Sequence, residues 1–263
     1  MNTIMLITIV VIIIIVILIL WKEKYKDLTI IITASYIPSH PSIEKIKDVI
    51  ESLKYLNIDN YDLILSHDYN SDSDDYKKYL DNLKDYIKDK NNIKIVIRDT
   101  HGHLVGNIRN SISHVKTEYI LVIQHDLPFI RNVNIYDIIS DMKLNNNLKH
   151  VRFNKVNNNR CKDNSFDNKN NTYGQIIYKN NYEYTSTDGW SDNNHLSTLK
   201  YYKDIVLKEC SDGGAMEHTL YGKIKNMEDH KYYGTYILGN KDDEPPYITH
   251  TDGSELWDDP NIY

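Results

Sequence analysis

The sequence predicts an α/β fold with a mostly parallel, doubly wound sheet behind one N-terminal transmembrane helix. Between residues 28 and 130, short apolar runs alternate with helical patterns, as in repeated βαβ units. The apolar runs are continuous, which is typical of strands buried on both faces. The helix is predicted by an uncharged segment near the start of the chain. We therefore expect an anchor at 4–21, a linker at 22–27 and one domain at 28–263.

The anchor segment from Ile4 to Trp21 has one polar residue, Thr8, and no charge. As a helix it would extend about 27 Å, close to the thickness of a bilayer core. A cleaved signal peptide is one alternative, but Trp-Lys-Glu-Lys-Tyr-Lys follows where a small-residue cleavage site would stand. A buried core helix is the other, but such a helix is rarely apolar all round.

Positive charge lies on one side of the segment only. Lys22, Lys24 and Lys26 follow it, and no Lys or Arg precedes it. The positive-inside rule therefore predicts a single-pass membrane protein whose soluble domain is cytosolic, with a lumenal domain as the alternative.

Charge and cysteine content exclude some classes of protein. The net charge of -6, with both signs interspersed, gives no electrostatic footprint for nucleic acid. Cys161 and Cys210 are too few for a disulfide framework or a cysteine-based zinc site. We expect two unpaired thiols.

The first half of the domain predicts four strands with three helices between them. The strands lie at 28–33, 61–65, 93–97 and 119–123, and Ser42 can cap the first helix. The helices are marked by apolar residues at helical spacing: Ile43, Ile46, Ile50 and Leu53, then Tyr76, Leu80, Leu83 and Ile87, then Leu104, Ile108, Ile112 and Val115. Ligands of such sheets bind beyond the C-terminal ends of the strands, so the polar residues there are candidates for a site.

The second half is less regular. We expect a helix at 134–144, a fifth strand at 149–154 and a mobile loop rich in Asn, Lys and Asp at 157–172. A hairpin, a helix starting near Gly214 and an irregular tail are expected to complete the chain.

Four segments of the sequence occur in the same order as in a known protein family. They are Leu-Thr-Ile-Ile-Ile-Thr-Ala-Ser-Tyr from Leu28, Leu-Ile-Leu-Ser-His-Asp ending at Asp68, His-Gly-His-Leu-Val-Gly-Asn-Ile-Arg-Asn from His101, and Glu-Tyr-Ile-Leu-Val-Ile-Gln-His-Asp ending at Asp126. In this order they resemble a family 2-like glycosyltransferase of the GT-A fold, similar to those of large DNA viruses. The resemblance implies a nucleotide-sugar half at 28–130 and an acceptor half at 131–263.

The last of these segments stands where the family has an Asp-x-Asp motif. Here the motif is Gln124-His125-Asp126, so the resemblance implies Asp126 as a ligand of Mn²⁺ or Mg²⁺ and Gln124 as a hydrogen-bond partner of the ribose. A hard cation neutralises the diphosphate and the leaving group. Related enzymes often recruit a distant C-terminal His, which His250 matches. The alternatives are that Asp126 only ends a strand and that His250 is structural.

The resemblance also implies a nucleotide site. Thr33 and Ser35, in the loop after the first strand, would hold the nucleotide. Asp68 would accept the imide N–H of uracil, or be one more acid in an acidic loop.

Arg109 is expected to pair with the diphosphate or with Asp68, with a surface charge as the alternative. His101 and His103 could approach the phosphate.

An inverting transferase needs a base that deprotonates the acceptor hydroxyl. The family usually places Glu-Asp at the start of a helix in the second half, where this chain has Glu217-His218. Glu217 is our first expectation for the base, with His218 and Asp192 as the other candidates. Glu217 could instead stabilise a helix N-terminus. Trp190 could stack on a sugar or belong to the core.

These expectations describe a membrane-anchored, metal-dependent glycosyltransferase. It would move a sugar from a nucleotide-sugar, in the first place a UDP-sugar, to a glycan, protein or lipid acceptor. A nucleotidyltransferase is one alternative, although residues 34–38 lack the glycine and basic residues of a triphosphate loop. The other is an inactive, glycan-binding or structural membrane protein derived from a transferase, which the departures at Gln124 and His218 would suit.

Overall fold

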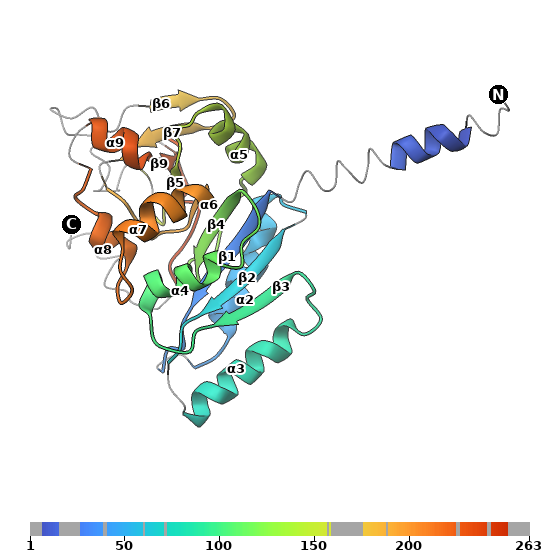
Figure 1. Ribbon diagram of the computed structural model, residues 1–263, viewed down its shortest axis with the longest axis vertical. Coiled ribbons are helices and arrows are strands. Elements are labelled where there is room, and N and C mark those ends of the chain that lie inside the picture. The colour runs from blue at the N-terminus through green and yellow to red at the C-terminus, as the bar shows by residue number, and fades with distance from the viewer. Residues whose placement is uncertain are drawn as a thin grey trace.

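The computed structural model describes residues 7–15, 27–38, 41–59, 61–70, 73–156, 158, 176–187, 189–224, 227–240 and 243–251. Within them, nine strands form one sheet in the order β3-β2-β1-β4-β8-β5-β9-β7-β6 (Figure 1). The strands are β1 (Leu28–Ala34), β2 (Asp62–His67), β3 (Ile93–Ile97), β4 (Tyr119–Gln124), β5 (His150–Arg152), β6 (Ile176–Lys179), β7 (Glu183–Ser186), β8 (His195–Thr198) and β9 (Thr235–Leu238). The helices are α2 (Glu44–Ser52), α3 (Asp74–Ile87), α4 (His103–Ile112), α5 (Ile135–Leu144), α6 (Leu199–Tyr201), α7 (Leu207–Glu209), α8 (Met216–Leu220) and α9 (Met227–Tyr233).

The first four strands are parallel, as the alternating pattern predicts. β1 lies between β2 and β4, and β3 is the outer strand beside β2. The register sets Ala34 opposite His67 and Thr33 opposite Gln124. The C-terminal ends of three strands therefore meet at one edge of the sheet.

The second half of the sheet is mixed, so the prediction of a mostly parallel sheet was wrong there. β8 runs antiparallel to both β4 and β5, and β7 runs antiparallel to β6 and β9. The connection between β6 and β7 is too short for a parallel crossover. The tail that we expected to be irregular instead supplies β9, which is buried between β5 and β7.

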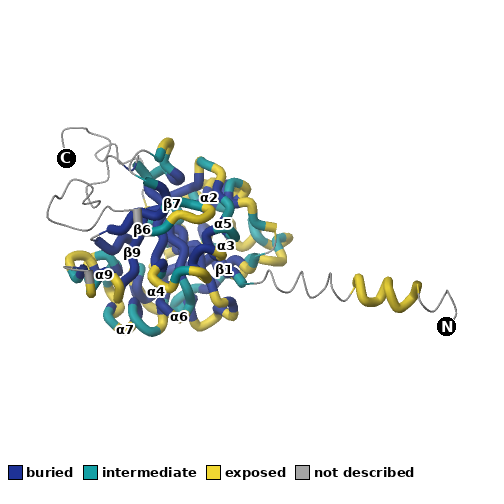
Figure 2. Tube along the Cα trace, turned by 90° about the horizontal axis from the view of Figure 1, so that it is seen from above, coloured by how far each residue is buried: buried dark blue, intermediate teal, exposed yellow. Residues whose placement is uncertain are grey.

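Each face of the sheet has its own hydrophobic core, because side chains alternate along a strand. On one face Ile30 and Ile32 pack with α2, α3 and α5. On the other face Ile31 packs with α4 and with the helices between 199 and 220. Figure 2 shows the buried strands enclosed by helices whose outer surfaces are exposed. The α/β prediction is thus confirmed.

The N-terminal segment is described in part. Residues 7–15 are helical and exposed. Within the described part of the chain, no helix has both the length and the apolar character needed to cross a membrane. The rest of the predicted anchor at 4–21, the linker up to 26, Cys161 and nearly all of the loop at 157–172 lie outside the described residues. Cys210 is free and buried.

Candidate active site

A cavity of about 220 Å³ opens at the C-terminal ends of β1, β2 and β4. Open α/β sheets bind ligands at this edge, where the strand order reverses. Its lining is formed by Thr33, Ala34, Ser35, Asp68, His101, His103, Leu104, Asn107, Gln124 and His125. The structure therefore brings together four of the five predicted nucleotide-binding residues.

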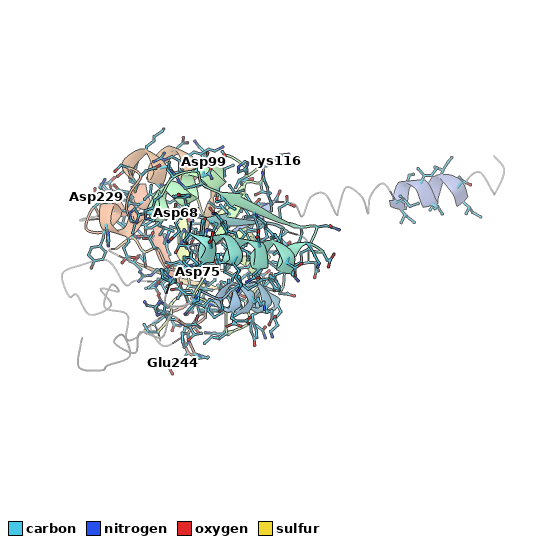
Figure 3. All side chains as sticks on the ribbon, turned by 90° about the horizontal axis from the view of Figure 1, so that it is seen from below. Asp68, Asp75, Asp99, Lys116, Asp229 and Glu244 are labelled. Atoms are coloured by element: carbon cyan, nitrogen blue, oxygen red, sulfur yellow. The ribbon has the colours of Figure 1, made fainter. Side chains whose placement is uncertain are left out.

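Asp68 lies at the floor of this cavity and is 3% exposed. Its Oδ1 accepts the backbone N–H of Gly102 at 2.9 Å, and its Oδ2 accepts that of His103 at 2.9 Å. Nδ1 of His101 lies 2.9 Å from Oδ2. Asp68 is buried, whereas Asp75 and Asp99, which are labelled with it in Figure 3, are exposed. The carboxylate thus neutralises the N-terminus of α4, a position that would otherwise attract an anion.

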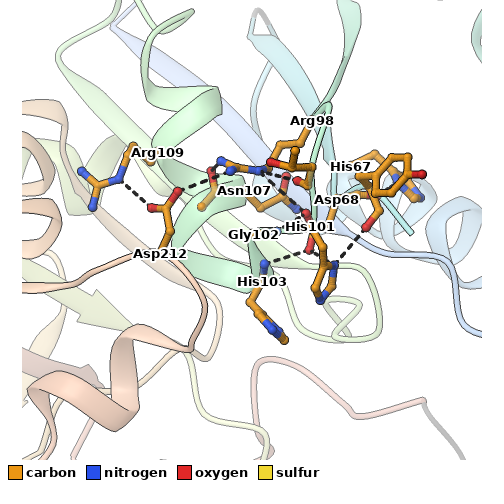
Figure 4. Close-up of polar contacts among 12 residues, drawn as sticks. His67, Asp68, Arg98, His101, Gly102, His103, Asn107, Arg109 and Asp212 are labelled. Atoms are coloured by element: carbon orange, nitrogen blue, oxygen red, sulfur yellow. Dashed lines mark hydrogen bonds and ion pairs between the residues drawn. The ribbon is translucent and has the colours of Figure 1, made fainter. Parts of the chain in front are cut away.

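Arg109 is the predicted nucleotide ligand that does not line the cavity. Its Nε lies 2.8 Å from Oδ1 of Asp212, and its Nη2 donates to the carbonyl oxygens of Leu207 and Cys210 (Figure 4). The arginine beside Asp68 is Arg98, at 3.9 Å between Nε and Oδ1. No sequence signal singled out Arg98, because its role depends on how β3 ends against α4.

One residue that lines the cavity, His103, has an unusual backbone conformation that the sequence pattern did not predict. His103 has a φ of 53°, a left-handed conformation that costs about 1 kcal/mol in a residue other than glycine. Its ring lies 4.2 Å from that of His101, centroid to centroid. Strain of this kind is often retained at ligand sites.

Asn107 fixes α4 against the ends of β1 and β2. Its Nδ2 donates to the carbonyl oxygens of Ala34 and Ser66, and its Oδ1 accepts from Oγ of Ser66 at 2.6 Å. A buried asparagine with these partners holds the cavity wall rigid.

The predicted metal ligands lie side by side. Nε2 of His250 is 3.3 Å from Oδ2 of Asp126. The Oδ1 atom of Asp126 is buried and has no hydrogen-bond partner among the described residues. Burial of an unpaired carboxylate oxygen is costly, so this atom is suited to bind a cation.

A C-terminal strap (residues 247–251) brings His250 to this position. Ile130 donates to the carbonyl of Tyr247, and Thr249 donates to that of Pro128. Thr251 donates to the carbonyl of Asp126 from both its backbone N–H and its hydroxyl. The strap thus pairs in an antiparallel manner with the segment after β4.

Next to Asp126, Nε2 of His125 is buried without a partner in the described part of the chain. Its Nδ1 lies 3.2 Å from the carbonyl oxygen of Thr33, and burial lowers its pKa. The neutral ring therefore donates from Nδ1 and leaves Nε2 as an acceptor.

Asp192 and Glu217 form a reciprocal pair. The backbone N–H of Glu217 donates to Oδ2 of Asp192 at 3.1 Å, and that of Asp192 donates to Oε2 of Glu217 at 3.0 Å. Oγ of Ser191 also donates to Oε2 at 3.1 Å. Burial, reinforced by the charge of Glu217, raises the pKa of Asp192 to about 7. Oδ1 of Asp192 is buried and has no partner among the described residues.

Gln124 joins this pair to the end of β4. Its Nε2 donates to the carbonyl of Asp192 at 2.7 Å, and its backbone N–H donates to Oδ1 of Asn194 at 3.0 Å. Asn194 in turn donates to the carbonyl of Leu127. The backbone of Asp192 is therefore bound to Gln124, which lines the cavity.

Two other candidates lie elsewhere. His218 is exposed on α8. Trp190 is 0% exposed, and its Nε1 donates to the hydroxyl of Tyr201 at 3.2 Å. Trp190 therefore belongs to the core, which was the alternative interpretation, and it offers no face to a sugar.

The side-chain oxygens and nitrogens here fit a divalent cation that is held partly by the protein and partly by a bound diphosphate. In the described residues, no group of three or more His, Cys, Asp and Glu side chains surrounds a common point. Asp126 and His250 could supply two ligands, and phosphate oxygens and water would complete the coordination of a hard cation.

No family model matches the chain, and no curated protein does either. Among solved structures, S. aureus TarS 1-349 is similar with a TM-score of 0.50 and 15% identity, over 88% of this chain and 62% of that chain. TarS 1-349 in complex with UDP-GlcNAc gives a TM-score of 0.50 and 12% identity, over 86% and 58%. TarS is a family 2 glycosyltransferase with a GT-A-like fold. This chain shares that mixed α/β fold and spans less than two thirds of the length of these TarS chains.

Proposed function

We propose that the chain is a glycosyltransferase that moves a sugar from a UDP-sugar to an acceptor hydroxyl. One observation carries the proposal: Asp126 and Asp192 each have a buried carboxylate oxygen without a partner in the described residues, and both residues are near Gln124, which lines the cavity. Asp126 follows Gln124 by two residues, and the carbonyl of Asp192 accepts from the side chain of Gln124. A metal-dependent inverting transferase uses one carboxylate to hold a cation and a base, here a second carboxylate, to take up a proton. The fold likeness to TarS with UDP-GlcNAc makes this sugar nucleotide the first donor to try.

In this proposal the nucleoside occupies the cavity and the diphosphate lies toward Asp126. The backbone N–H groups at the start of α4 are already bound by Asp68, so that end of the cavity suits an uncharged base and ribose. Asp126 and His250 would hold Mn²⁺ or Mg²⁺, which supplies charge neutralisation for the departing diphosphate.

Asp192 takes the role of the base in this mechanism. Oδ1 of Asp192 accepts the proton of the acceptor hydroxyl while the hydroxyl oxygen forms its bond to the anomeric carbon. The bond from the anomeric carbon to the phosphate oxygen breaks, and UDP leaves. A pKa of about 7 suits this task near neutral pH. Glu217, our first expectation from sequence, holds Asp192 through its own carboxylate and backbone.

Release of UDP from a panel of UDP-sugars, with and without Mn²⁺, tests the proposal. We expect Asp126→Ala to lower metal-dependent turnover by about 100-fold or more, as loss of a charge-stabilising group does. Asp75→Asn, an exposed carboxylate on α3, serves as the control and should keep full activity. Full activity of Asp126→Ala would overturn the metal assignment. Absence of both UDP binding and turnover in the unmodified chain would favour an inactive, transferase-derived protein.

The membrane anchor, the cytosolic placement and the resemblance to enzymes of large DNA viruses stay predictions. The acceptor class, whether glycan, protein or lipid, is also part of the proposal.

A further inference from the structure

The loop between α7 and α8 is held by one acidic residue, Asp212. Its Oδ1 lies 2.8 Å from Nε of Arg109, and its Oδ2 lies 3.3 Å from Nη2 of Arg98 (Figure 4). Arg109 belongs to α4 and Arg98 follows β3, and both lie in the first half of the domain (residues 28–130). The carboxylate of Asp212 thus connects a loop of the second half of the domain (residues 131–263) with two elements of the first half.

Arg98 is fixed by more than this ion pair. Its Nη1 donates to the carbonyl of Gly106 at 2.5 Å, and its Nε donates to that of Thr100. A Cβ atom at Gly102 would lie 2.5 Å from Nε of Arg98, and one at Gly106 would lie 3.0 Å from its guanidinium. The two glycines therefore leave the space in which Arg98 lies, against Asp68 at one end and Asp212 at the other.

The backbone on either side of Asp212 is also bound to the start of α4. Gly213 donates to the carbonyl of Gly102 at 3.2 Å, and Val105 donates to that of Gly214 at 3.0 Å. Gly213 has a φ of 99°, which a glycine adopts without strain. Arg109 closes the other end of the loop through the carbonyl of Cys210.

This loop leads directly into α8, which carries Glu217. The helix has five residues, and its N-cap residue, Ala215, makes no side-chain capping bond. So short a helix is not stable by itself. The position of Glu217, and with it the bonds that hold Asp192, depends on the loop that precedes it.

We propose that Asp212 is a positioning residue that sets the Asp192–Glu217 pair relative to the donor cavity by bridging Arg98 and Arg109. This inference rests on the proposed function. Asp212 touches neither donor nor acceptor in this arrangement and acts through α8. Since Asp68 still holds Arg98 and α4 when Asp212 is replaced, the donor cavity keeps its shape.

The test compares Asp212→Asn, Asp212→Ala and Asp212→Glu with the unmodified full chain. The side chains of Asp212 and Arg109 are each 41% exposed, and exposed ion pairs contribute little to global stability, so the variants should fold. We expect kcat for UDP-GlcNAc to fall about tenfold in the Asn and Ala variants, since small misplacements of catalytic groups cost about that much or more. The Kd for UDP, measured by calorimetry, should stay within about threefold. Asp212→Glu should recover part of kcat.

The pH dependence of kcat separates positioning from a general loss of structure. Among the described residues, Glu217, Tyr202 and Cys210 are titratable groups that interact with Asp192. Burial is the main cause of the raised pKa of Asp192. A loosened loop should let water reach the carboxyl group and lower this pKa, so the rise of kcat on the acidic side of its pH profile should move to lower pH.

Asp204→Asn, which breaks an exposed ion pair with Lys200, is the control and should change neither kcat nor the profile. An unchanged kcat and an unchanged acidic limb in Asp212→Ala would overturn the inference. A UDP affinity lost in parallel with kcat would overturn it too, because Asp212 would then support the donor cavity itself. Failure of the unmodified chain to bind UDP would instead count against the proposed function.

Discussion

Asp192 is a carboxyl group whose charge state is set by its surroundings. Burial is the larger cause of its raised pKa, the charge of Glu217 adds to it, and the backbone bond from Glu217 opposes both. One of its oxygens is bound and the other is left without a partner in the described residues. These are the properties of a base that works near neutral pH.

The first prediction concerns catalysis by Asp192. With a pKa of about 7 the base is protonated below that pH, so kcat should rise about tenfold per pH unit up to pH 7 and then level off. Asp192→Asn should remove this limb and lower kcat by about 100-fold or more. The measurement is kcat against pH with saturating donor. A mutant that kept the acidic limb would assign it to another group.

The second prediction concerns stability. The pKa of Asp192 in the folded chain, about 7, lies above the ordinary aspartate value of 3.8. A raised pKa contributes stability that is fully present below pH 4 and is lost as pH rises through 7. Asp192→Asn cannot ionise, so it should be more stable than the unmodified chain at pH 8, by about 4 kcal/mol, and equal to it near pH 4. Urea unfolding at both pH values measures the difference. A gain of equal size at pH 4 would refute the linkage.

At the scale of elements, α4 is the helix on which the donor cavity depends. Its N-terminus is capped by Asp68 from β2, and Asn107 on its first turns binds the ends of β1 and β2. The carboxylate comes from another strand, so no local capping motif in the sequence marks it.

The third prediction tests this cap. Asp68→Ala leaves the N–H groups of Gly102 and His103 without their acceptor, which should lower the free energy of unfolding by about 1–3 kcal/mol. Asp62→Ala, on the exposed end of the same strand, should change it by less than about 0.5 kcal/mol. Urea denaturation of both variants gives the comparison. Equal effects would mean that Asp68 does not hold α4.

Elements of the first half could be predicted because their signals are local. β1 and β4 are continuous apolar runs, and α3 shows its apolar stripe within its own sequence. β8 and β9 carry buried polar residues such as Ser197 and Thr235, whose hydroxyl groups donate to the carbonyls of Lys149 and Thr187, far along the chain. Propensity and periodicity do not report such partners, so the mixed half of the sheet was not foreseen.

At the scale of the whole molecule, the proposed metal site would join Asp126, from the middle of the domain, to His250 in the C-terminal strap. The fourth prediction is that His250→Ala weakens Mn²⁺ binding in the presence of UDP by about tenfold or more, since one of the two proposed protein ligands would be lost. Calorimetry measures this, with His114→Ala as a control because His114 is exposed beside Lys94. An unchanged Mn²⁺ affinity would mean that His250 has a structural role and is not a metal ligand.

The fifth prediction concerns the N-terminal segment. The full chain should remain with membranes after alkaline carbonate extraction, and a chain that starts at Asp27 should be released, because residues 4–21 are apolar and uncharged. Protease treatment of sealed membranes then tests sidedness, and a protected domain would contradict the cytosolic prediction. Release of the full chain by carbonate would contradict the anchor.

The sequence by itself determined the α/β class, the four parallel strands and the edge at which Thr33, Asp68 and Gln124 meet. It could do so because apolar runs and helical spacing are local patterns, and parallel strands share one C-terminal edge. Only the tertiary structure decided that Asp68 caps α4, that Arg109 turns to Asp212 and that Asp192 is the buried member of its pair with Glu217. Those outcomes depend on burial and on distances between residues far apart in sequence, which no local pattern contains.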